Sequence, residues 1–450
     1  MASFRPPRGM HDLLPTAFRK MSLIRDVAMR VCGGYGYQMV ETPVVEHKSV
    51  FVRSLGDDSD VVAKEMYAVS GSDGSASREE LILRPEMTAS VVRALLSEPD
   101  LHHTFPHRWM YCGPMFRYER PQKGRLRQFH QTGIELLGSS HPRADVECLS
   151  VGLDFLNNLF PTTSFSNLKF KVLVNSLGDA ESRTSYRKEL TSHFEKHLSS
   201  LSEDSASRFR RGSVLRILDS KSPEDREAIT TAPSLMEFLN PLSSARFMEV
   251  RSLLQDYLEQ FGPEMMQRFE LHVDPRLVRG LDYYSHTCFE VACESPLLGE
   301  SQSTVLAGGR YDGLSEALGG KNVPSIGWAA GVERLSLLRY PDDAHTVSPE
   351  MPVVVVVVVG NAPYLYQLAR SIRLCCGNVV VLHNFEDVRL DKALKKASRI
   401  SADFVVFERL CERGATEQGY VIRDLKKSIQ EEATTLAAAL QIVSSFLDAK

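Results

Sequence analysis

The stretch Gly-Pro-Met-Phe-Arg-Tyr-Glu-Arg-Pro-Gln-Lys-Gly-Arg-Leu-Arg-Gln-Phe-His-Gln-Thr-Gly-Ile-Glu-Leu-Leu-Gly, residues 113–138, decides the fold that this chain is predicted to adopt. It begins as a strand, breaks between Pro121 and Gly124, and continues as a second strand, a pattern that predicts a hairpin. In the second strand Gln131 and Glu135 are four positions apart, an even spacing. Their side chains therefore fall on one face.

The turn of this hairpin is strongly basic, with five basic residues and one acid, Glu119, between Arg117 and Arg127. Arginine forms forked contacts with phosphate groups, so a hairpin lined with arginine suits a polyphosphate beside a small polar substrate. Charge alone leaves a solvated surface turn as the alternative. The order of the residues, considered below, decides between the two.

Length and composition set broad limits on the protein. The chain has 450 residues, enough for two or three domains, with 43% hydrophobic and 24% charged residues, as in ordinary globular proteins. The formal net charge of −4 gives no general attraction to nucleic acid. Any contact with RNA is therefore expected from local basic patches.

The cysteines and the apolar runs exclude several classes of protein. No two of the eight cysteines have Cys-x-x-Cys spacing, so no metal-ligand set is predicted. Scattered thiols in a long chain indicate a reducing compartment, and we expect a cytoplasmic protein. The valine run 353–359 is too short to span a bilayer and is typical of a buried strand, so no membrane association is predicted.

The N-terminal region mixes helix and strand patterns. A helix is predicted at 21–32 and a strand at 37–45. A polar loop follows at 71–78, and then a short strand leads into Arg84-Pro-Glu-Met-Thr, with a helix beginning at Thr88. Glu86 has two interpretations: an acid that stabilises the start of a helix, or a carboxylate that binds an ammonium group.

The rest of the chain divides into an insertion, a return to strands, and a separate C-terminal region. Residues 161–269 are mostly helical with basic faces, and no catalytic group is visible there. Strand patterns return from 271 and lead through a glycine-rich turn at 307–314 into a helix that carries Arg334. After 350, strands at 353–359, 379–382 and 404–407 alternate with helices at 362–374, 390–400 and 430–447, which indicates a small α/β domain.

One helix of this C-terminal region has a basic face. Lys392, Lys395, Lys396 and Arg399 lie at positions i, i+3, i+4 and i+7 and therefore line one side of the helix. Such a stripe fits phosphate contacts that position RNA, although a merely solvated face is the common alternative.

Several motifs occur in an order that resembles one enzyme family. Phe-Arg-x-Glu, followed by a loop and a second strand, resembles motif 2 of the class II aminoacyl-tRNA synthetases, and residues 120–131 resemble the histidyl family in particular. The same family is matched over essentially the whole chain by further segments. These are an entry segment at 8–15, a substrate loop at 84–89, two histidine-specific motifs at 277–284 and 307–314, and a motif 3 at 327–335.

The resemblance implies an α+β catalytic core on a mostly antiparallel sheet, formed by 1–160 and 270–340. It also implies a helical insertion at 161–269 and an anticodon-binding α/β domain at 351–450. A homodimer is implied by the weak motif 1 match of helix, strand and Pro43.

The resemblance also implies how ATP is held. Arg117 is expected to grip the α-phosphate, Arg334 the γ-phosphate, and Arg125 the polyphosphate tail. Arg279 is expected near the α-phosphate and the substrate carboxylate, and with Arg117 it is the predicted catalytic residue. Mg²⁺ is expected to accompany ATP, because negative charge spreads over phosphate oxygens in the transition state.

The histidine pocket is assigned on the same basis. Glu135 and Tyr284 are expected to bind the imidazole nitrogens of L-histidine, with Tyr283 alongside. The α-amino end is expected at Glu86, Thr88 and Gln131. Met87 stands where the family usually has glycine, so the pocket entrance is expected to be narrower.

The implied function is that of a histidine–tRNA ligase, with L-histidine, ATP and tRNA(His) as partners. The alternative is a non-catalytic paralogue that senses histidine and regulates its biosynthesis; such paralogues typically lose the catalytic arginines and the anticodon domain. A plain RNA-binding protein is a third possibility, which leaves the ordered motifs unexplained. The segment 407–414 departs from the family pattern, so anticodon contacts are not assigned to residues.

Overall fold

The computed structural model forms two compact units, Met1–Ala344 and His345–Lys450, which are described separately. The structure describes residues 4–56, 59, 61–70, 80–278, 283–298, 303–341, 354–359, 363–376, 379–384, 389–409 and 419–448.

The first unit is built on an eight-stranded sheet with the order β1-β5-β6-β11-β10-β9-β7-β8. Its neighbours are antiparallel except for the two outer pairs, β1 with β5 and β7 with β8. The mostly antiparallel sheet predicted from the sequence is therefore confirmed. Its strands are β1 (Gln38–Met39), β5 (His107–Phe116), β6 (Gln128–Leu137), β7 (Phe170–Ser176), β8 (Phe269–Val273), β9 (Ser285–Ala292), β10 (Thr304–Arg310) and β11 (Ser325–Gly331).

The predicted hairpin is present as β5 and β6. These strands pair from His107 opposite Leu137 to Phe116 opposite Gln128. The chain then turns through an isolated bridge between Gln122 and Arg125, and Gly124 between them has φ 73°. Glycine adopts this left-handed conformation without the steric cost that other residues incur.

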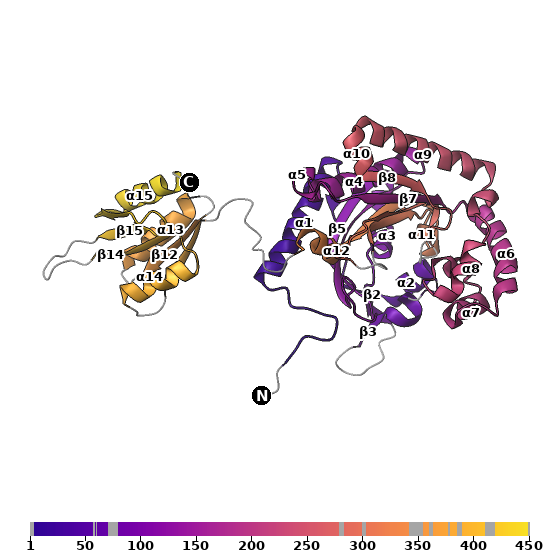
Figure 1. Ribbon diagram of the computed structural model, residues 1–450, viewed down its shortest axis with the longest axis horizontal. Helices are drawn as coiled ribbons and strands as arrows, with labels where there is room; N and C mark the ends of the chain where they lie inside the picture. The colour runs from indigo at the N-terminus through magenta and orange to yellow at the C-terminus, as the bar shows by residue number, and fades with distance from the viewer. Residues whose placement is uncertain are drawn as a thin grey trace. The chain divides into compact units, whose positions relative to one another are not determined.

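Helices cover one face of this sheet and shield its main apolar core (Figure 1). Trp328 of β11 is part of this core, where its ring stacks on Phe155 at 5.9 Å between centroids. The Trp328 indole Nε1 donates to the Cys148 carbonyl at 2.9 Å, so its polar atom is satisfied. The covering helices are α1 (Pro15–Gly34), α4 (Pro142–Leu159), α9 (Pro241–Gln260) and α12 (Val332–Arg339).

A second apolar core lies around α3 (Thr88–Leu96), which begins where the sequence predicted a helix. It includes β5 residues such as Tyr111 and Met115, whereas Met110 belongs to the first core, as alternation along a strand requires. A small sheet in the order β2-β4-β3 and a short helix stand beside α3. These elements are β2 (Val45–His47), β3 (Tyr67–Val69), β4 (Leu81–Leu83) and α2 (Lys48–Leu55).

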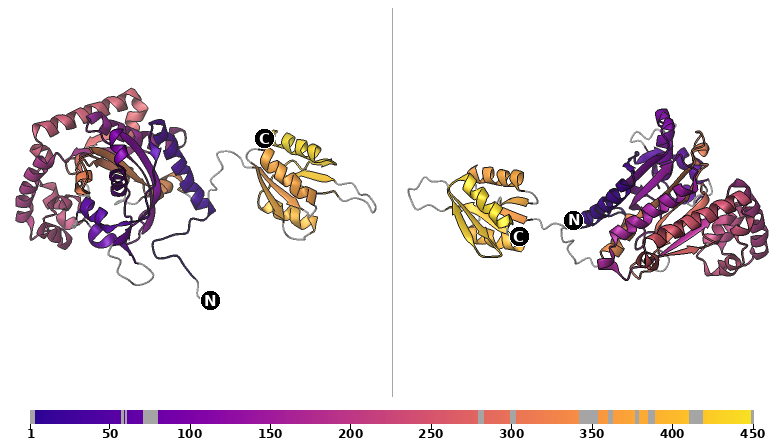
Figure 2. Two further views of the ribbon diagram at one scale, coloured as in Figure 1. Left: turned by 180° about the vertical axis from the view of Figure 1, so that it is seen from behind. Right: turned by 90° about the horizontal axis from the view of Figure 1, so that it is seen from above.

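Helices predominate in the range where an insertion was predicted. Helices α6 (Ala180–His197), α7 (Glu203–Arg210) and α8 (Arg226–Thr230) gather to one side of the sheet (Figure 2). The range predicted for the insertion, 161–269, also contains β7, which belongs to the main sheet. The helical excursion therefore runs from 177 to 268, between two strands that pair with each other, and it includes α9 and α10 (Pro263–Arg268).

The second unit is an α/β domain, as predicted. Its sheet has the order β13-β12-β14-β15-β16, with α14 (Leu390–Arg399) on one face and α13 (Pro363–Cys375) and α15 (Leu436–Asp448) on the other (Figure 1). On α14, Ala393 and Ala397 are buried against the sheet. The strands are β12 (Val354–Val359), β13 (Val379–Asn384), β14 (Phe404–Glu408), β15 (Tyr420–Asp424) and β16 (Gln430–Ala433).

Two secondary-structure predictions were wrong. The strand predicted at 37–45 is interrupted, because β1 pairs with β5 and the chain then crosses to β4 as β2. Pro43 lies in the crossing, where its missing N–H costs no ladder hydrogen bond. The helix predicted at 430–447 is instead edge strand β16 followed by α15, since Gln430–Ala433 pairs with β15.

A buried ion network ties the sheet to α4 and α9. Asp145 of α4 and Arg310 of β10 are both fully buried and paired, with Arg310 Nε 2.8 Å from the Asp145 carboxylate. Asp145 also accepts from the Arg246 guanidinium at 2.7 Å and the Thr287 hydroxyl at 3.0 Å. Removing the shared acid would take the anionic partner from Arg246 and would leave Arg310 with Asp312, at 2.9 Å, in place of two carboxylates.

We therefore expect Asp145→Ala to lower the free energy of unfolding of the first unit by about 3 kcal/mol. Urea unfolding followed by tryptophan fluorescence measures this, because both tryptophans, Trp109 and Trp328, lie in that unit. Glu294→Ala is the matched control, since it removes an exposed ion pair with Lys171. Equal unfolding midpoints for the two variants would contradict a structural role for the network.

Candidate active site

A cavity of about 800 Å³ lies in the first unit and collects side chains from both strands of the β5–β6 hairpin, from the start of α3, and from β9 to β11. Eight of the eleven predicted site residues line it. They are Glu86, Thr88, Arg117, Arg125, Gln131, Tyr283, Tyr284 and Arg334. Segments up to about 250 residues apart in the sequence therefore meet in one place.

Three arginines form the cationic part of the cavity. Arg117 donates from Nε to the Pro85 carbonyl at 3.0 Å and lies over the Phe129 ring at 5.2 Å. Arg334 donates to the Thr304 carbonyl at 2.7 Å and to the Gly124 carbonyl at 3.3 Å, which ties α12 to the turn of the hairpin. Arg125 is paired with the Glu119 carboxylate.

These cations are close enough to oppose one another's charge. Burial lowers the pKa of Arg334, and the neighbouring charges of Arg125 and Arg117 lower it further, with Glu119 in partial opposition. A site that holds like charges together in a partly buried setting is suited to an anionic ligand. The arrangement fits a polyphosphate better than it fits a structural arginine cluster.

The position of Glu86 is compatible with both interpretations that the sequence left open. Its carboxylate accepts from the backbone N–H groups of Thr88 at 2.6 Å and Ala89 at 2.9 Å, so it caps α3. The same carboxylate lines the cavity, and burial raises its pKa. These two hydrogen bonds hold the Glu86 carboxylate in one orientation on the cavity wall, which suits the binding of an ammonium group.

Glu135 lies under the cavity, in the middle of the sheet. Its carboxyl group accepts from the Thr88 hydroxyl at 2.6 Å, the Tyr111 hydroxyl at 3.4 Å, and the Tyr311 hydroxyl. Burial raises its pKa to about 8, against the lowering effect of the Thr88 and Tyr311 hydrogen bonds. The three hydroxyl-bearing side chains all line the cavity, so Glu135 orients its polar floor.

Glycine makes room for this group. Gly327 lies opposite Glu135 in the pairing of β6 and β11, and a β-carbon there would stand 1.8 Å from Glu135 Oε2. Gly133, two residues before Glu135 on β6, makes room in the same way. A β-carbon there would stand 2.5 Å from the Tyr111 hydroxyl oxygen. Both glycines are therefore required by the close approach of the buried polar cluster.

Gln131 and the two tyrosines complete the predicted pocket. The side-chain oxygen of Gln131 is buried and accepts no hydrogen bond from the described residues, which leaves it available to a ligand. Tyr283 and Tyr284 are buried beside each other, with ring centroids 4.6 Å apart, and Tyr283 also meets Tyr311 edge to face at 5.7 Å. The tyrosines thus belong both to the core and to the cavity wall.

Two predicted residues stand apart from this description. Met87 is 1% exposed and does not line the cavity; its sulfur accepts a hydrogen bond from the Thr42 hydroxyl at 3.3 Å, behind the start of α3. It therefore lies away from the described cavity wall that it was expected to narrow. Arg279 lies outside the described residues.

Sequence reasoning missed several side chains of the cavity. Tyr311 and Glu333 stood within recognised motifs, and Glu333 accepts from the His130 backbone N–H at 2.9 Å. Tyr111 could also have been found, because it lies two residues before the hairpin motif that begins at Gly113. Asp219 and Lys221 come from the insertion, where no local pattern marks them.

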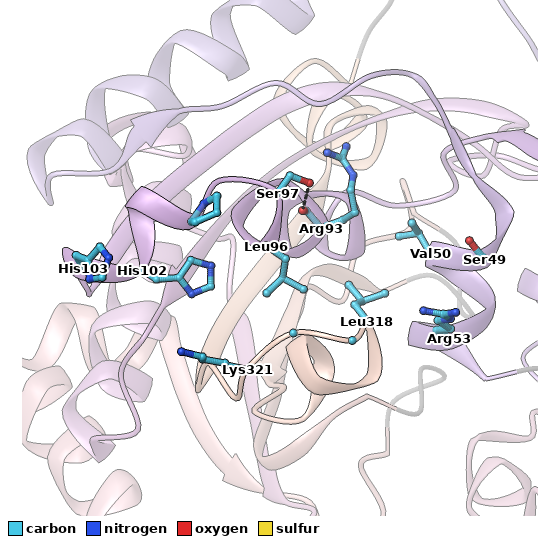
Figure 3. A pocket seen from close by; sticks show the side chains of 13 residues that line it. Ser49, Val50, Arg53, Arg93, Leu96, Ser97, His102, His103, Leu318 and Lys321 are labelled. Atoms are coloured by element: carbon cyan, nitrogen blue, oxygen red, sulfur yellow. Dashed lines mark hydrogen bonds between the residues drawn. The ribbon is translucent and has the colours of Figure 1, made fainter.

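A second cavity of about 560 Å³ lies between α2, α3 and the loop after α11 (Leu314–Ala317) (Figure 3). Arg53 and Lys321 stand at opposite ends of it, with Leu96 and Leu318 between them. None of the predicted site residues lines this cavity. The substrate chemistry is therefore assigned to the larger one.

The described residues contain no group of three or more His, Cys, Asp and Glu side chains that could hold a metal ion. The seven described cysteines are all free thiols. No described helix is both long enough and apolar enough to cross a bilayer.

Known proteins resemble this chain over nearly its full length. A family model described as histidyl-tRNA synthetase matches residues 9–335. A histidine–tRNA ligase of Rhodospirillum rubrum is 40% identical over 450 residues, covering 99% of this chain and 100% of the relative. That of Gluconacetobacter diazotrophicus is 42% identical over 411 residues, covering 90% and 91%. The solved apo structure of S. aureus histidyl-tRNA synthetase matches with a TM-score of 0.73 and 27% identity, covering 98% of this chain and 99% of that one.

The buried carboxyl of Glu135 predicts a specific pH dependence. Well below pH 4.5 the Glu135 carboxyl is neutral in both the folded and the unfolded protein. Above pH 4.5 it ionises in the unfolded protein, whereas in the folded protein it stays neutral until about pH 8. Stability should therefore fall as pH rises through this window, by up to about 1.4 kcal/mol per unit from this group.

Glu135→Gln removes the titrating group while keeping its shape. We expect the loss of stability between pH 5 and pH 8 to be smaller in this variant than in the unmodified protein, measured by urea unfolding at both pH values. An identical pH dependence would show that Glu135 is not held neutral in the folded state.

Proposed function

The chain belongs to the histidyl-tRNA synthetase family, and we propose from its site how it acts as a histidine–tRNA ligase. The enzyme activates L-histidine with ATP to histidyl-adenylate and transfers the histidyl group to the 3′ end of tRNA(His). The observation that carries the site assignment is the meeting of three arginines and a buried carboxyl–hydroxyl cluster in one cavity.

The arginines supply the electrostatics of the activation step. In this step a histidine carboxylate oxygen attacks the α-phosphorus of ATP, a P–O bond forms, and the bond to pyrophosphate breaks. Arg117 is assigned to the α-phosphate and Arg334 to the γ-phosphate, with Arg125 on the polyphosphate tail. Cations already fixed in place stabilise the developing charge without reorganisation. Arg279 remains the proposed partner of the α-phosphate and the substrate carboxylate.

Magnesium is the metal that the family implies, and the cavity offers it suitable oxygen chemistry. Mg²⁺ commonly binds through one or two carboxylates together with substrate phosphates, so a preformed protein cage is not required. Glu290 of β9 lines the cavity and accepts from the Thr304 hydroxyl at 2.8 Å. We assign Glu290 as the carboxylate that would hold the ion. When bound, Mg²⁺ would neutralise phosphate charge.

The polar floor is assigned to L-histidine. Glu86, Thr88 and Gln131 would hold the α-amino end, supported by the fixed carboxylate of Glu86 and the buried amide oxygen of Gln131. Glu135 and Tyr284 would meet the imidazole nitrogens, with Tyr283 beside them. A neutral carboxyl group has one O–H donor and further acceptor lone pairs, so Glu135 retains hydrogen-bonding capacity beyond the three hydroxyls. Met87 lies behind this wall and would affect the binding of histidine only through packing.

Contact with tRNA(His) is proposed for the second unit as well as for the cavity. Lys392, Lys395 and Arg399 on α14 are exposed along the face opposite the buried alanines, which supports phosphate contacts. We therefore propose 351–450 as the anticodon-binding domain. Within the first unit we propose a catalytic domain whose sheet includes β7, with the helical insertion at 177–268 in place of the predicted 161–269.

Two further assignments are proposals of the same kind. A homodimer is supported by the exposed apolar side chains Phe18 and Met29 on α1 and Met39 on the edge strand β1. A cytoplasmic location is supported by the free thiols of the described cysteines.

The regulatory paralogue is the competing function. It would use the same histidine pocket but would have no need of a polyphosphate site or an anticodon domain. Arg117, Arg125 and Arg334 line the cavity together, and a second α/β unit is present. Both features favour the ligase.

Amino-acid-dependent ATP–pyrophosphate exchange with all twenty amino acids tests the proposed function. We expect exchange with L-histidine alone, because only imidazole satisfies the buried polar floor. Arg334→Ala should reduce the rate about 10²-fold, as loss of a fixed charge partner in the transition state does.

Arg339→Ala is the matched control, since Arg339 lies on the same helix α12 but does not line the cavity. Its exchange rate should stay within about twofold of the unmodified rate. Histidine binding without any exchange would contradict the ligase and favour the regulatory paralogue.

A further inference from the structure

A short loop of the insertion reaches the cavity. Asp219 and Lys221 line it, and they are the only residues between 177 and 268, a segment described throughout, that do so. The other side chains of the cavity come from the sheet, from α3, from α12, or from the segments that join them. The helical insertion, which otherwise lies away from the cavity, therefore contributes one acidic and one basic side chain to it.

Buried apolar side chains on the N-terminal side of Asp219 hold this loop in place. The 3₁₀ turn Val214–Asp219 places Ile217 and Leu218 in the second apolar core, with Ile217 fully buried. The same core contains Tyr283 and Tyr284 of the histidine pocket. The loop is thus packed against the wall that it overlooks.

Hydrogen bonds to the carboxylate of Asp225, here called the polar node, also hold the loop in place. The Ser220 hydroxyl donates to Asp225 at 2.5 Å, and Asp225 is fully buried. Asp225 also accepts from the Ser202 hydroxyl at 2.7 Å and the Ser205 hydroxyl at 2.6 Å. Because four donors, including the Ser202 N–H, converge on one buried carboxylate, the backbone on both sides of Lys221 is held in place.

The side chain of Lys221 is exposed and is therefore available to a ligand. Its side chain is 77% exposed, and its ammonium group is 3.4 Å from the Asp219 carboxylate. Exposed pairs of this kind are weak and readily exchanged for a stronger anion. An ammonium group offers three donors on a flexible stem and is a common phosphate binder.

We propose that Lys221 is a substrate-binding residue of the active site, supplied by the insertion, which binds phosphate oxygens, and that Ser220 and Asp225 are its positioning residues. The proposal rests on the proposed function of the cavity. The phosphate belongs either to the polyphosphate of ATP or to the 3′-terminal nucleotides of the tRNA, and both present the same chemistry.

The test compares Lys221→Ala and Lys221→Arg with Lys188→Ala, which removes an exposed lysine of insertion helix α6 that does not line the cavity. Two affinities are measured by titration, for a non-hydrolysable ATP analogue and for tRNA(His). Neither needs catalysis, so failure of the proposed reaction would not mask the result.

If the phosphate is that of ATP, Lys221→Ala should weaken the analogue by about five- to tenfold, while Lys221→Arg retains most of the affinity. If it is that of tRNA, only the tRNA affinity should fall, by a similar factor. Both affinities within twofold of the Lys188→Ala control would overturn the proposal.

Ser220→Ala tests the positioning role. It should weaken the same ligand as Lys221→Ala, by less, and should have no further effect when Lys221 is already alanine, because the two act on one contact. An equal effect of Ser220→Ala in both backgrounds would show that the node supports the fold alone and does not position the lysine.

Discussion

The buried carboxyl group of Glu135 is the constraint on which the rest of the site depends. A carboxyl in the middle of a sheet is tolerated only where donors surround it, and here hydroxyls from α3, β5 and the end of β10 supply them. Space for it exists only because β11 has glycine opposite. The register of four neighbouring strands is thus tied to one polar cluster, and Arg310, adjacent to Tyr311, anchors that cluster to α4 through Asp145.

The two halves of the cavity solve opposite electrostatic problems. At the end that we propose for histidine, burial suppresses charge, so Glu135 and the tyrosines present oriented hydroxyls and a nearly neutral floor. At the other end, three arginines are held together at the expense of mutual repulsion, which an incoming polyphosphate relieves. The hairpin turn joins the halves, because β6 carries Gln131 and Glu135 while the loop before it carries Arg125. One supersecondary unit therefore sets the distance between the two proposed substrate sites.

The sequence predicted most of this arrangement where the signal was local. Alternation along 128–137 was enough to place Gln131 and Glu135 on one face, and glycine and proline marked the turn correctly. The partners of Glu135 could not be predicted, because Tyr111 and Tyr311 meet it only through strand register. Lys221 was missed for the same reason: its place depends on how the insertion packs. In the second unit, the polar residues 430–433 formed edge strand β16 through pairing with β15, although their composition favoured a helix.

The central claim is that Glu135 and its hydroxyl partners form the imidazole end of a histidine pocket. Calorimetric titration with L-histidine of the unmodified protein and of Glu135→Gln tests it most directly. The account predicts that the amide variant binds L-histidine at least about tenfold more weakly, because a buried hydrogen-bond acceptor for the imidazole is lost or misoriented. Equal affinity in the two proteins would contradict it and would limit Glu135 to a structural role under the cavity.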